Sequence, residues 1–353
     1  MTLDRTRRGL FEKARRLGTG AARITLDDNE CRKIIGIIAR DLGIEDERLT
    51  QPPELPDFYS PEFVEWQSEG SAAGIEAFEA LVDSVTDGEL FFYCLAAIHL
   101  RRLKYQRILA AQPLPTLEQV GPRALLQYGM APPLYLAALL FWRKWIYDID
   151  NRAAQETGYI FEPIIAASIG GVPYSDKKSP VRRQSGKGGR QVDCVRGDDA
   201  YELKLRVTIA ASGQGRWDAE LEYPEDCEAS GFRPVLVVFD STENPKLNQL
   251  KEAFERAGGV HFVGDHAWSH LEELAGETMG VFLEKYVRRP LESLLDDAPP
   301  MNDLPPLSLR QEDSFIVVRL GDFEMRIERT TEELDLEDDD ALPDDVDDEL
   351  PGG

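Results

Sequence analysis

One five-residue run limits the fold of this chain more than any other feature of the sequence. Residues 235–239, Val-Leu-Val-Val-Phe, are apolar at every position, which is typical of a central strand covered on both faces. A helical pattern over 246–257 follows, and then come Gly258-Gly259 and a short β-branched run over 260–263. This order predicts a β-α-β crossover, and therefore parallel strands within an α/β fold.

The rest of the chain divides by sequence pattern into four parts. Wide apolar faces at helical spacing over 31–42, over 89–110 and from Pro133 through Trp145 predict a mainly helical region over 1–157. Short β-branched runs and a final helix over 268–288, ending at Pro290, predict an α/β core over 158–295. A Pro-rich linker and a peripheral hairpin are expected over 296–330, and a disordered acidic tail over 331–353.

Composition excludes several classes of protein. The 353 residues include 65 Asp and Glu against 40 Lys and Arg, and 42% are hydrophobic, which fits a globular chain with a sizeable core. The most apolar stretch, 131–142, is well short of the roughly 20 residues that a bilayer span needs. The N-terminus lacks the apolar core of a signal peptide, so we expect a cytoplasmic protein with no membrane contact. Four widely spaced cysteines favour reduced core thiols over a zinc site or a disulfide framework.

The segment that suggests chemistry is a predicted hairpin over 191–206. If Gly197-Asp198 form its two-residue turn, residues whose numbers sum to 395 face each other, and Asp193 lies opposite Glu202. Because side chains alternate along a strand, Lys204 then shares a face with these two carboxylates. The opposite face is expected to be core, made by Val192, Cys194, Tyr201, Leu203 and Leu205.

Two opposed carboxylates are destabilising unless something positive lies between them. A divalent metal held by Asp193 and Glu202 would satisfy both, and oxygen-only ligation suits Mg²⁺. Lys204, beside Glu202, could orient the attacking water or help to deprotonate it. These groups together can hydrolyse a phosphodiester.

At these residues the chain resembles the PD-(D/E)xK nuclease superfamily, with Asp193 followed by Glu202-Leu203-Lys204 and with Val192 where the superfamily name has Pro. The resemblance implies a mixed-sheet restriction-endonuclease-like core with flanking helices. It also implies an auxiliary catalytic carboxylate on the preceding helix, and Glu162 occupies that position. A helical region before one such core looks most like a type II restriction endonuclease. The segment 206–217, Arg-Val-Thr-Ile-Ala-Ala-Ser-Gly-Gln-Gly-Arg-Trp, further resembles the ApaLI-like restriction enzymes.

A basic island surrounds the motif in this otherwise acidic chain. Residues 177–217 hold ten Lys and Arg against four Asp and Glu, a net charge of +6, as phosphate binding requires. Six of these cations are expected to contact the DNA backbone: Lys177, Lys178, Arg182, Arg183, Lys187 and Arg190. Gln214 and Arg216, in an expected loop after the second strand, are candidates for bidentate contacts to bases.

The sequence therefore predicts a Mg²⁺-dependent, sequence-specific double-stranded DNA endonuclease. A homodimer is expected, because two related active sites match a two-fold DNA site. Three alternatives stay open at this stage. Glu-x-Lys occurs by chance on exposed strand edges, a repair or recombination nuclease of the same superfamily would carry the same motif, and the acidic composition suits a non-enzymatic DNA mimic.

Overall fold

The computed structural model describes residues 5–49, 55–66, 73–186, 188–205 and 214–330. One of its sheets is a mixed five-stranded sheet in the order β3-β4-β5-β6-β7. The strands are β3 (Val172–Tyr174), β4 (Val192–Arg196), β5 (Asp199–Lys204), β6 (Arg233–Val238) and β7 (Val260–Val263). Antiparallel pairing joins β3, β4 and β5, whereas β5, β6 and β7 are parallel. The predicted α/β class with a mixed sheet is confirmed.

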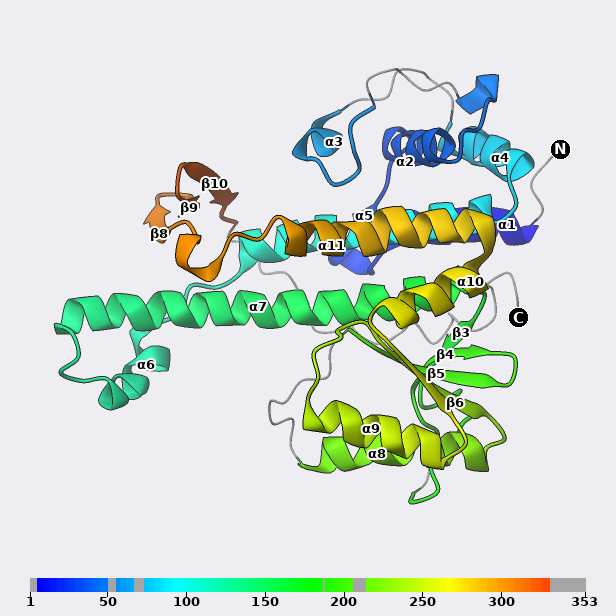
Figure 1. The fold of residues 1–353 in the computed structure, drawn as a ribbon. Coiled ribbons are helices and arrows are strands. Elements are labelled where there is room, and N and C mark those ends of the chain that lie inside the picture. The colour runs from blue at the N-terminus through cyan, green and yellow to red at the C-terminus, as the bar shows by residue number, and fades with distance from the viewer. Residues whose placement is uncertain (1–4, 50–54, 67–72, 187, 206–213, 331–353) are drawn as a thin grey trace.

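Helices cover both faces of this sheet (Figure 1). On one face lie α8 (Gln214–Ala229) and α9 (Pro245–Arg256), and α9 makes the predicted crossover between β6 and β7. On the other face lie parts of α7 (Pro133–Ser168) and α10 (Asp265–Phe282). Val235 and Val237 join the core cluster on the α7 side, and Leu236 and Val238 join the cluster on the α8 side. Burial on both faces explains why β6 is apolar from Val235 to its end.

The N-terminal part is helical, as predicted. Its helices are α1 (Arg5–Ala14), α2 (Asp28–Asp41), α3 (Pro61–Glu65), α4 (Gly74–Ser84), α5 (Gly88–Ala111) and α6 (Leu117–Val120). Between them lie the 3₁₀ turns η1 (Gly20–Ala22), η2 (Glu47–Leu49) and η3 (Gly121–Leu126), and the two-residue strands β1 (Arg16–Leu17) and β2 (Ile24–Thr25). A reciprocal capping box between Asp27 and Glu30 starts α2, because each side chain accepts from the other residue's backbone N–H.

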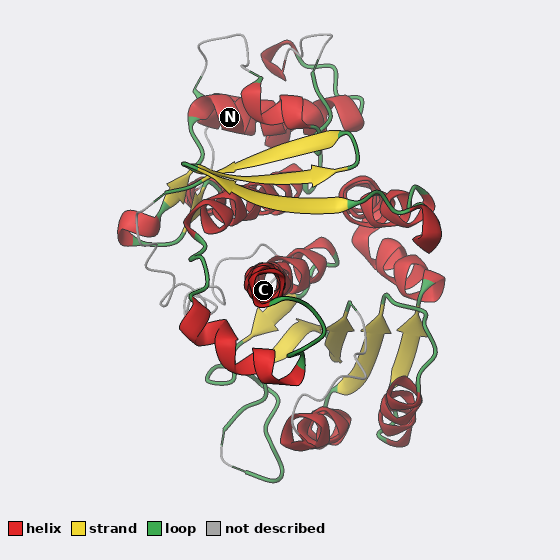
Figure 2. Cartoon of the chain, turned by 90° about the vertical axis from the view of Figure 1, so that its left-hand side faces the viewer, coloured by secondary structure: helices red, strands yellow, loops and turns green. Residues whose placement is uncertain are grey.

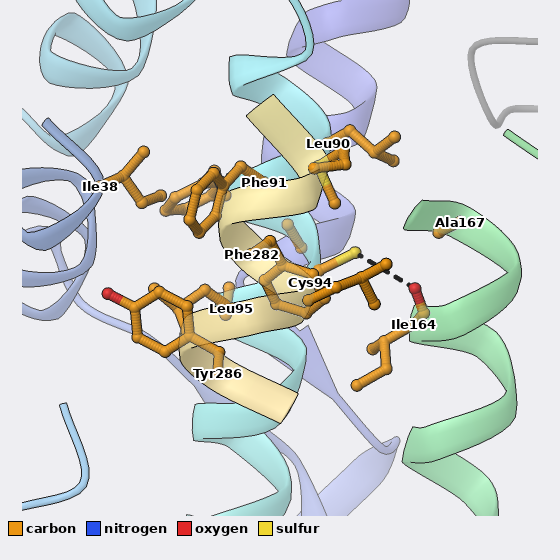
Figure 3. Packing of buried hydrophobic residues seen from close by; sticks show 14 of the residues in the cluster. Ile38, Leu90, Phe91, Cys94, Leu95, Ile164, Ala167, Phe282 and Tyr286 are labelled. Atoms are coloured by element: carbon orange, nitrogen blue, oxygen red, sulfur yellow. Dashed lines mark hydrogen bonds between the residues drawn. The ribbon is translucent and has the colours of Figure 1, made fainter. Parts of the chain in front are cut away.

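The helix α7 connects the helical region to the sheet. Its 36 residues span about 54 Å at 1.5 Å per residue, and it passes without a break through residue 157. Its C-terminal part enters a core that both halves share. There Phe91 of α5 packs against Phe282 of α10, and the Cys94 thiol lies 4.0 Å from the Ile164 carbonyl oxygen of α7 (Figure 3).

The chain after α10 stays helical further than predicted. A π-helical segment η4 (Leu283–Arg288) leads into α11 (Arg289–Asp296), so the expectation that the helix ends at Pro290 was wrong. Pro290 is the second residue of α11 and has no N–H to donate to the Tyr286 carbonyl four residues before it, but that carbonyl accepts a hydrogen bond of 2.6 Å from the Tyr59 hydroxyl. Across the described residues, no helix combines the length and the apolar composition that crossing a membrane would require.

A small antiparallel sheet completes the described chain. After η5 (Met301–Asp303) it comprises β8 (Leu307–Glu312), β9 (Phe315–Leu320) and β10 (Phe323–Glu328). The predicted hairpin is β9 and β10, and β8 adds a strand that sequence analysis missed. Ile316 and Ile327 of this sheet pack against Trp145 of α7. Figure 2, viewed from the end of α7, shows it as a layer separate from the five-stranded sheet.

Candidate active site

The predicted hairpin forms with the predicted register. Its turn begins at Gly197, whose φ of +58° favours glycine. The paired residues are Arg196 with Asp199, Val195 with Ala200, and Cys194 with Tyr201. All three pairs sum to 395, so the same register directs Asp193 toward Glu202.

The ladder changes at Asp193, which is buried. Its Oδ2 accepts a hydrogen bond of 2.8 Å from the backbone N–H of Leu203, a donor that a continued ladder would direct to Val192. Val192 instead packs with Val181 in the cluster on the α8 side. The expectation that Val192 shares a face with Cys194 was therefore wrong. The Asp193 carboxylate takes the place of the Val192 carbonyl as acceptor for the Leu203 N–H, so the strand departs from regular alternation at this point.

Lys204 lies between two carboxylates. Its Nζ is 2.7 Å from Oε1 of Glu202 and 3.7 Å from Oε2 of Glu220, which comes from α8. Sequence analysis missed Glu220 because it expected a loop, not a helix, after the Glu202-x-Lys204 strand. The four-residue spacing of Trp217 and Leu221, both packed on the sheet, was the available sign of a helix.

Electrostatics connect Glu162 of α7 to the same cluster. Burial and, to a smaller extent, the charge of Glu202 raise the pKa of Glu162 to about 7, and Lys204 opposes the shift. Burial also raises the pKa of Asp193 well above its usual range, with Glu202 and Glu162 adding to the effect. For Lys204, burial favours the neutral amine, but Glu202 and Glu220 outweigh it and raise the pKa. The structure thus brings all four predicted catalytic residues within electrostatic reach of one another.

The cluster has an excess of negative charge that a cation would offset. Asp193, Glu202 and Glu162 bring three carboxyl groups to the single ammonium of Lys204, the charge of Glu202 raises the pKa of the other two, and carboxylate oxygens suit a hard divalent ion. Within the described residues, however, no group of three or more His, Cys, Asp or Glu side chains is already arranged around a metal position. The donor set fits a divalent cation, but Glu202 must turn from the Lys204 ammonium to ligate it.

Four of the predicted phosphate-binding cations lie at the surface beside the sheet. Lys177 and Lys178 are exposed in the turn after β3. Arg182 and Arg183 are exposed in the following loop, where the Arg183 Nε donates to the Gly189 carbonyl oxygen. That loop returns to the core through an isolated bridge between Arg182 and Gly189.

Arg190 is buried, whereas a DNA contact requires an exposed side chain. It is 6% exposed, and its guanidinium binds Asp226 and Glu222 of α8. Asp226 is itself buried and accepts from the backbone N–H of Gln184. The ion pair holds the loop that contains Arg182 and Arg183, called the basic loop below, against α8. Arg190 is therefore a buried structural residue in this structure rather than a surface cation.

The remaining predicted DNA contacts are only partly described. Lys187 lies outside the described residues, as does the segment 206–213. Gln214 and Arg216 belong to the first turn of α8 rather than to a loop, which corrects that expectation, and their side chains lie outside the described part of the structure.

Comparison with known proteins places this geometry in a family. Residues 64–288 match the family model described as ApaLI-like restriction endonuclease. The chain is also 47% identical over 294 residues to the "Type II restriction enzyme ApaLI" of Acetobacter pasteurianus, an alignment that covers 78% of each chain. No solved structure matches the chain.

Proposed function

Because this chain belongs to the ApaLI-like restriction endonuclease family, and is therefore a sequence-specific DNA endonuclease, we propose that Asp193, Glu202 and Lys204 form its active site. The observation that carries this assignment is their convergence at one edge of the hairpin, with Glu162 within electrostatic reach. Family membership also decides among the alternatives that the sequence left open, against both the DNA mimic and the repair nuclease.

The cofactor that this site fits best is Mg²⁺. Asp193 and Glu202 would hold it, because carboxylate oxygens are the ligands that Mg²⁺ prefers and the site has negative charge to offset. Bound there, the ion would polarise the scissile phosphate and lower the pKa of a water molecule.

The structure favours one of the two roles open to Lys204. Its raised pKa keeps the ammonium protonated at neutral pH, so Lys204 would orient the attacking water and stabilise negative charge on the phosphate rather than remove a proton. Glu162, with a pKa of about 7 in the metal-free protein, is better suited to accept a proton near neutral pH.

DNA would approach from the side of the basic loop. Lys177, Lys178, Arg182 and Arg183 are exposed there and would bind phosphates without regard to sequence. Gln214 and Arg216, at the start of α8, would supply base contacts. The working enzyme would be a cytoplasmic homodimer, since cutting both strands of a two-fold site requires two active sites.

Digestion of a defined plasmid, followed by sequencing of the ends, tests the proposal. Discrete cleavage sites are expected with Mg²⁺ and none with EDTA, and Asp193→Ala should be inactive. The matched control is Asp198→Ala, which removes an acidic residue from the hairpin turn without touching the cluster. Metal-independent cleavage, or full activity in Asp193→Ala, would overturn the assignment.

A further inference from the structure

A second feature of the molecule lies far from this cluster. We call residues 117–147 the apolar arm; they comprise α6, η3 and the N-terminal part of α7, and Figure 1 shows them projecting beyond the sheet and its helices. Among the described residues, 19 large hydrophobic side chains are exposed, and ten of these belong to the arm. The arm has only a small buried cluster of its own, formed by Val120, Leu136 and Leu140.

The exposed side chains of the arm have a combined apolar area comparable with that of a protein interface. Leu125, Leu126, Tyr128, Leu134, Tyr135 and Leu139 are between 54% and 89% exposed. At roughly 100 Å² each, the ten exposed side chains of the arm present about 1,000 Å² of apolar surface. A soluble monomer rarely exposes a contiguous patch above a few hundred Å². Each partner in a standard protein interface contributes about 800 Å².

Part of this surface is a regular stripe along α7. Tyr135, Leu139, Trp142 and Ile146 follow one another at spacings of four, three and four residues, which places them on one face of the helix. Leu136 and Leu140, by contrast, point into the small cluster under α6. Such a stripe is the pattern by which a helix packs against another helix. Trp142 packs partly against the cluster formed with the small sheet, whereas Tyr135, Leu139 and Ile146 are between 41% and 68% exposed.

Charged residues are sparse in the arm, which holds only Glu118, Arg123, Arg143 and Lys144, in a chain that is 30% charged. No Asp, Glu, Lys or Arg occurs from Ala124 to Trp142. Two copies of a chain with a net charge of −25 can meet most closely where neither presents carboxylates. The run from Ala124 to Trp142 offers such a place, and because an isologous contact brings the same patch of each copy together, it would pair apolar surface with apolar surface.

We infer that the apolar arm is the surface on which a second copy of this chain docks. The inference deepens the proposed function, and it rests on that function for the need to bring two active sites to one DNA site. One rigid helix would then join the interface to the chemistry, because α7 carries the stripe at one end and Glu162 near the other. Contact between copies would thereby set the placement of each active site.

Other occupants fit this surface less well. Nucleic acid binding needs cations to replace phosphate counterions, and the run from Ala124 to Trp142 has none. Interfacial membrane helices have a Lys- and Arg-rich polar face, which α7 lacks beside its stripe. The segment 332–353, with 12 carboxylates, is a poor partner for an uncharged surface.

The test is the mass of the full-length protein in solution, measured by light scattering or sedimentation. Wild type is expected at twice its 39.7 kDa chain mass. Leu126→Glu/Leu139→Glu should raise the dimer dissociation constant at least ~100-fold, since symmetry buries each introduced charge twice. The matched control is Leu294→Glu on α11, an equally exposed leucine outside the arm, which should stay dimeric.

Two further measurements keep the outcomes separable. Circular dichroism should show that the double variant is folded, and Leu126→Gln/Leu139→Gln gives a milder version if it is not. A monomeric wild type, or arm variants that remain dimeric, would overturn the inference. Two other results would also overturn the inference. One is a monomeric wild type that floats together with phosphatidylcholine vesicles, and the other is a protein that dimerises only after truncation at Thr331.

The assignment of the active site is tested independently of the dimer interface. Asp193→Ala is expected to be inactive and dimeric, whereas the arm variants are expected to be monomeric with the catalytic cluster intact. An active Asp193→Ala with monomeric arm variants would leave the interface standing and remove the active-site assignment. An inactive Asp193→Ala with dimeric arm variants would do the reverse.

Discussion

The Oδ2 atom of Asp193 accepts the backbone N–H of Leu203 at 2.8 Å, so a carboxylate proposed to hold a metal ion also closes the hairpin on which the site is built. The two roles of Asp193 can be separated by substitution. An asparagine keeps an oxygen that can accept from Leu203 but removes the charge, whereas an alanine removes both.

Asp193→Asn and Asp193→Ala should therefore both lose cleavage, by at least about 100-fold, the scale for removing one group that stabilises transition-state charge. Their stabilities should differ. Asp193→Asn is expected to match or exceed wild type in the absence of metal, because repulsion from Glu202 and Glu162 is relieved. Asp193→Ala removes the same repulsion but also loses the hydrogen bond to Leu203, which contributes about 1 kcal/mol to stability. Thermal unfolding in EDTA measures the difference, and equal stability of the two variants would contradict a structural role for this bond.

The second prediction concerns pH and Glu162. Burial, with Glu202, raises the pKa of Glu162 from 4.5 to about 7 in the folded protein. Between these values the folded state binds more protons than the unfolded state, so the free energy of unfolding in EDTA should fall as pH rises from about 4.5 to about 7. Glu162→Gln should flatten part of this decline, with Asp193 retaining the rest.

Urea denaturation at pH 5 and pH 8 provides the measurement for Glu162→Gln. The control is Glu252→Gln, which replaces an exposed glutamate on α9 and should leave the wild-type slope unchanged. An equal slope in wild type and Glu162→Gln would show that the carboxyl group is not held near Glu202 in solution.

The third prediction separates metal binding from cleavage. The Lys204 ammonium occupies Oε1 of Glu202 at 2.7 Å, so it competes with a cation for the same oxygen. Lys204→Ala should lose cleavage and yet bind Mn²⁺ as tightly as wild type or more tightly. Asp193→Ala should lose both properties. Calorimetric titration of each variant with Mn²⁺ checks this, and weaker binding in Lys204→Ala would mean that the lysine positions Glu202 for the metal instead.

The fourth prediction compares a buried arginine with a surface lysine. Arg190→Ala leaves Asp226 buried without its partner, which should destabilise the fold by about 3–5 kcal/mol. Lys178→Ala removes an exposed side chain and should shift the unfolding midpoint far less than Arg190→Ala does, while it reduces the salt dependence of nonspecific DNA binding by about one phosphate contact. Unfolding curves and binding titrations over several salt concentrations distinguish the two. A stable Arg190→Ala with weakened DNA binding would restore Arg190 to the DNA-contacting set.

Sequence patterns predicted the structure correctly where local interactions determine it. The turn at Gly197 sets the register that brings Asp193 toward Glu202, and the uniformly apolar run 235–239 indicates a strand with helices on both faces. A two-residue period and a turn residue are local properties, so they can be recognised without a structure.

The incorrect predictions concern residues whose environment is set by tertiary packing. A buried and a solvent-exposed arginine look the same in sequence, and only the packing of α8 against the basic loop shows that Arg190 binds Asp226. Glu220 reaches Lys204 for the same reason. The glycine- and serine-rich segment before α8 indicated a loop, and the helix that begins at Gln214 was missed because the spacing of Trp217 and Leu221 is a weaker local signal than that segment.

The fifth prediction concerns the recognition of DNA sequence. Gln214 and Arg216 open α8, and Arg216 lies one helical turn, about 6 Å of rise, before Glu220, whose carboxylate is 3.7 Å from the Lys204 ammonium. A base contact from this turn would therefore be made close to the scissile phosphate. A bidentate contact from arginine to guanine contributes roughly 1–3 kcal/mol of discrimination, so Arg216→Ala should slow cleavage at the cognate site by about 10- to 100-fold. Nonspecific affinity should change little, whereas Lys178→Ala should weaken binding to all sequences alike. The measurement is the ratio of cleavage rates on cognate and single-mismatch duplexes. If Arg216→Ala leaves that ratio at the wild-type value, bases are read from another part of the chain, and the helical region before α7 becomes the first place to substitute.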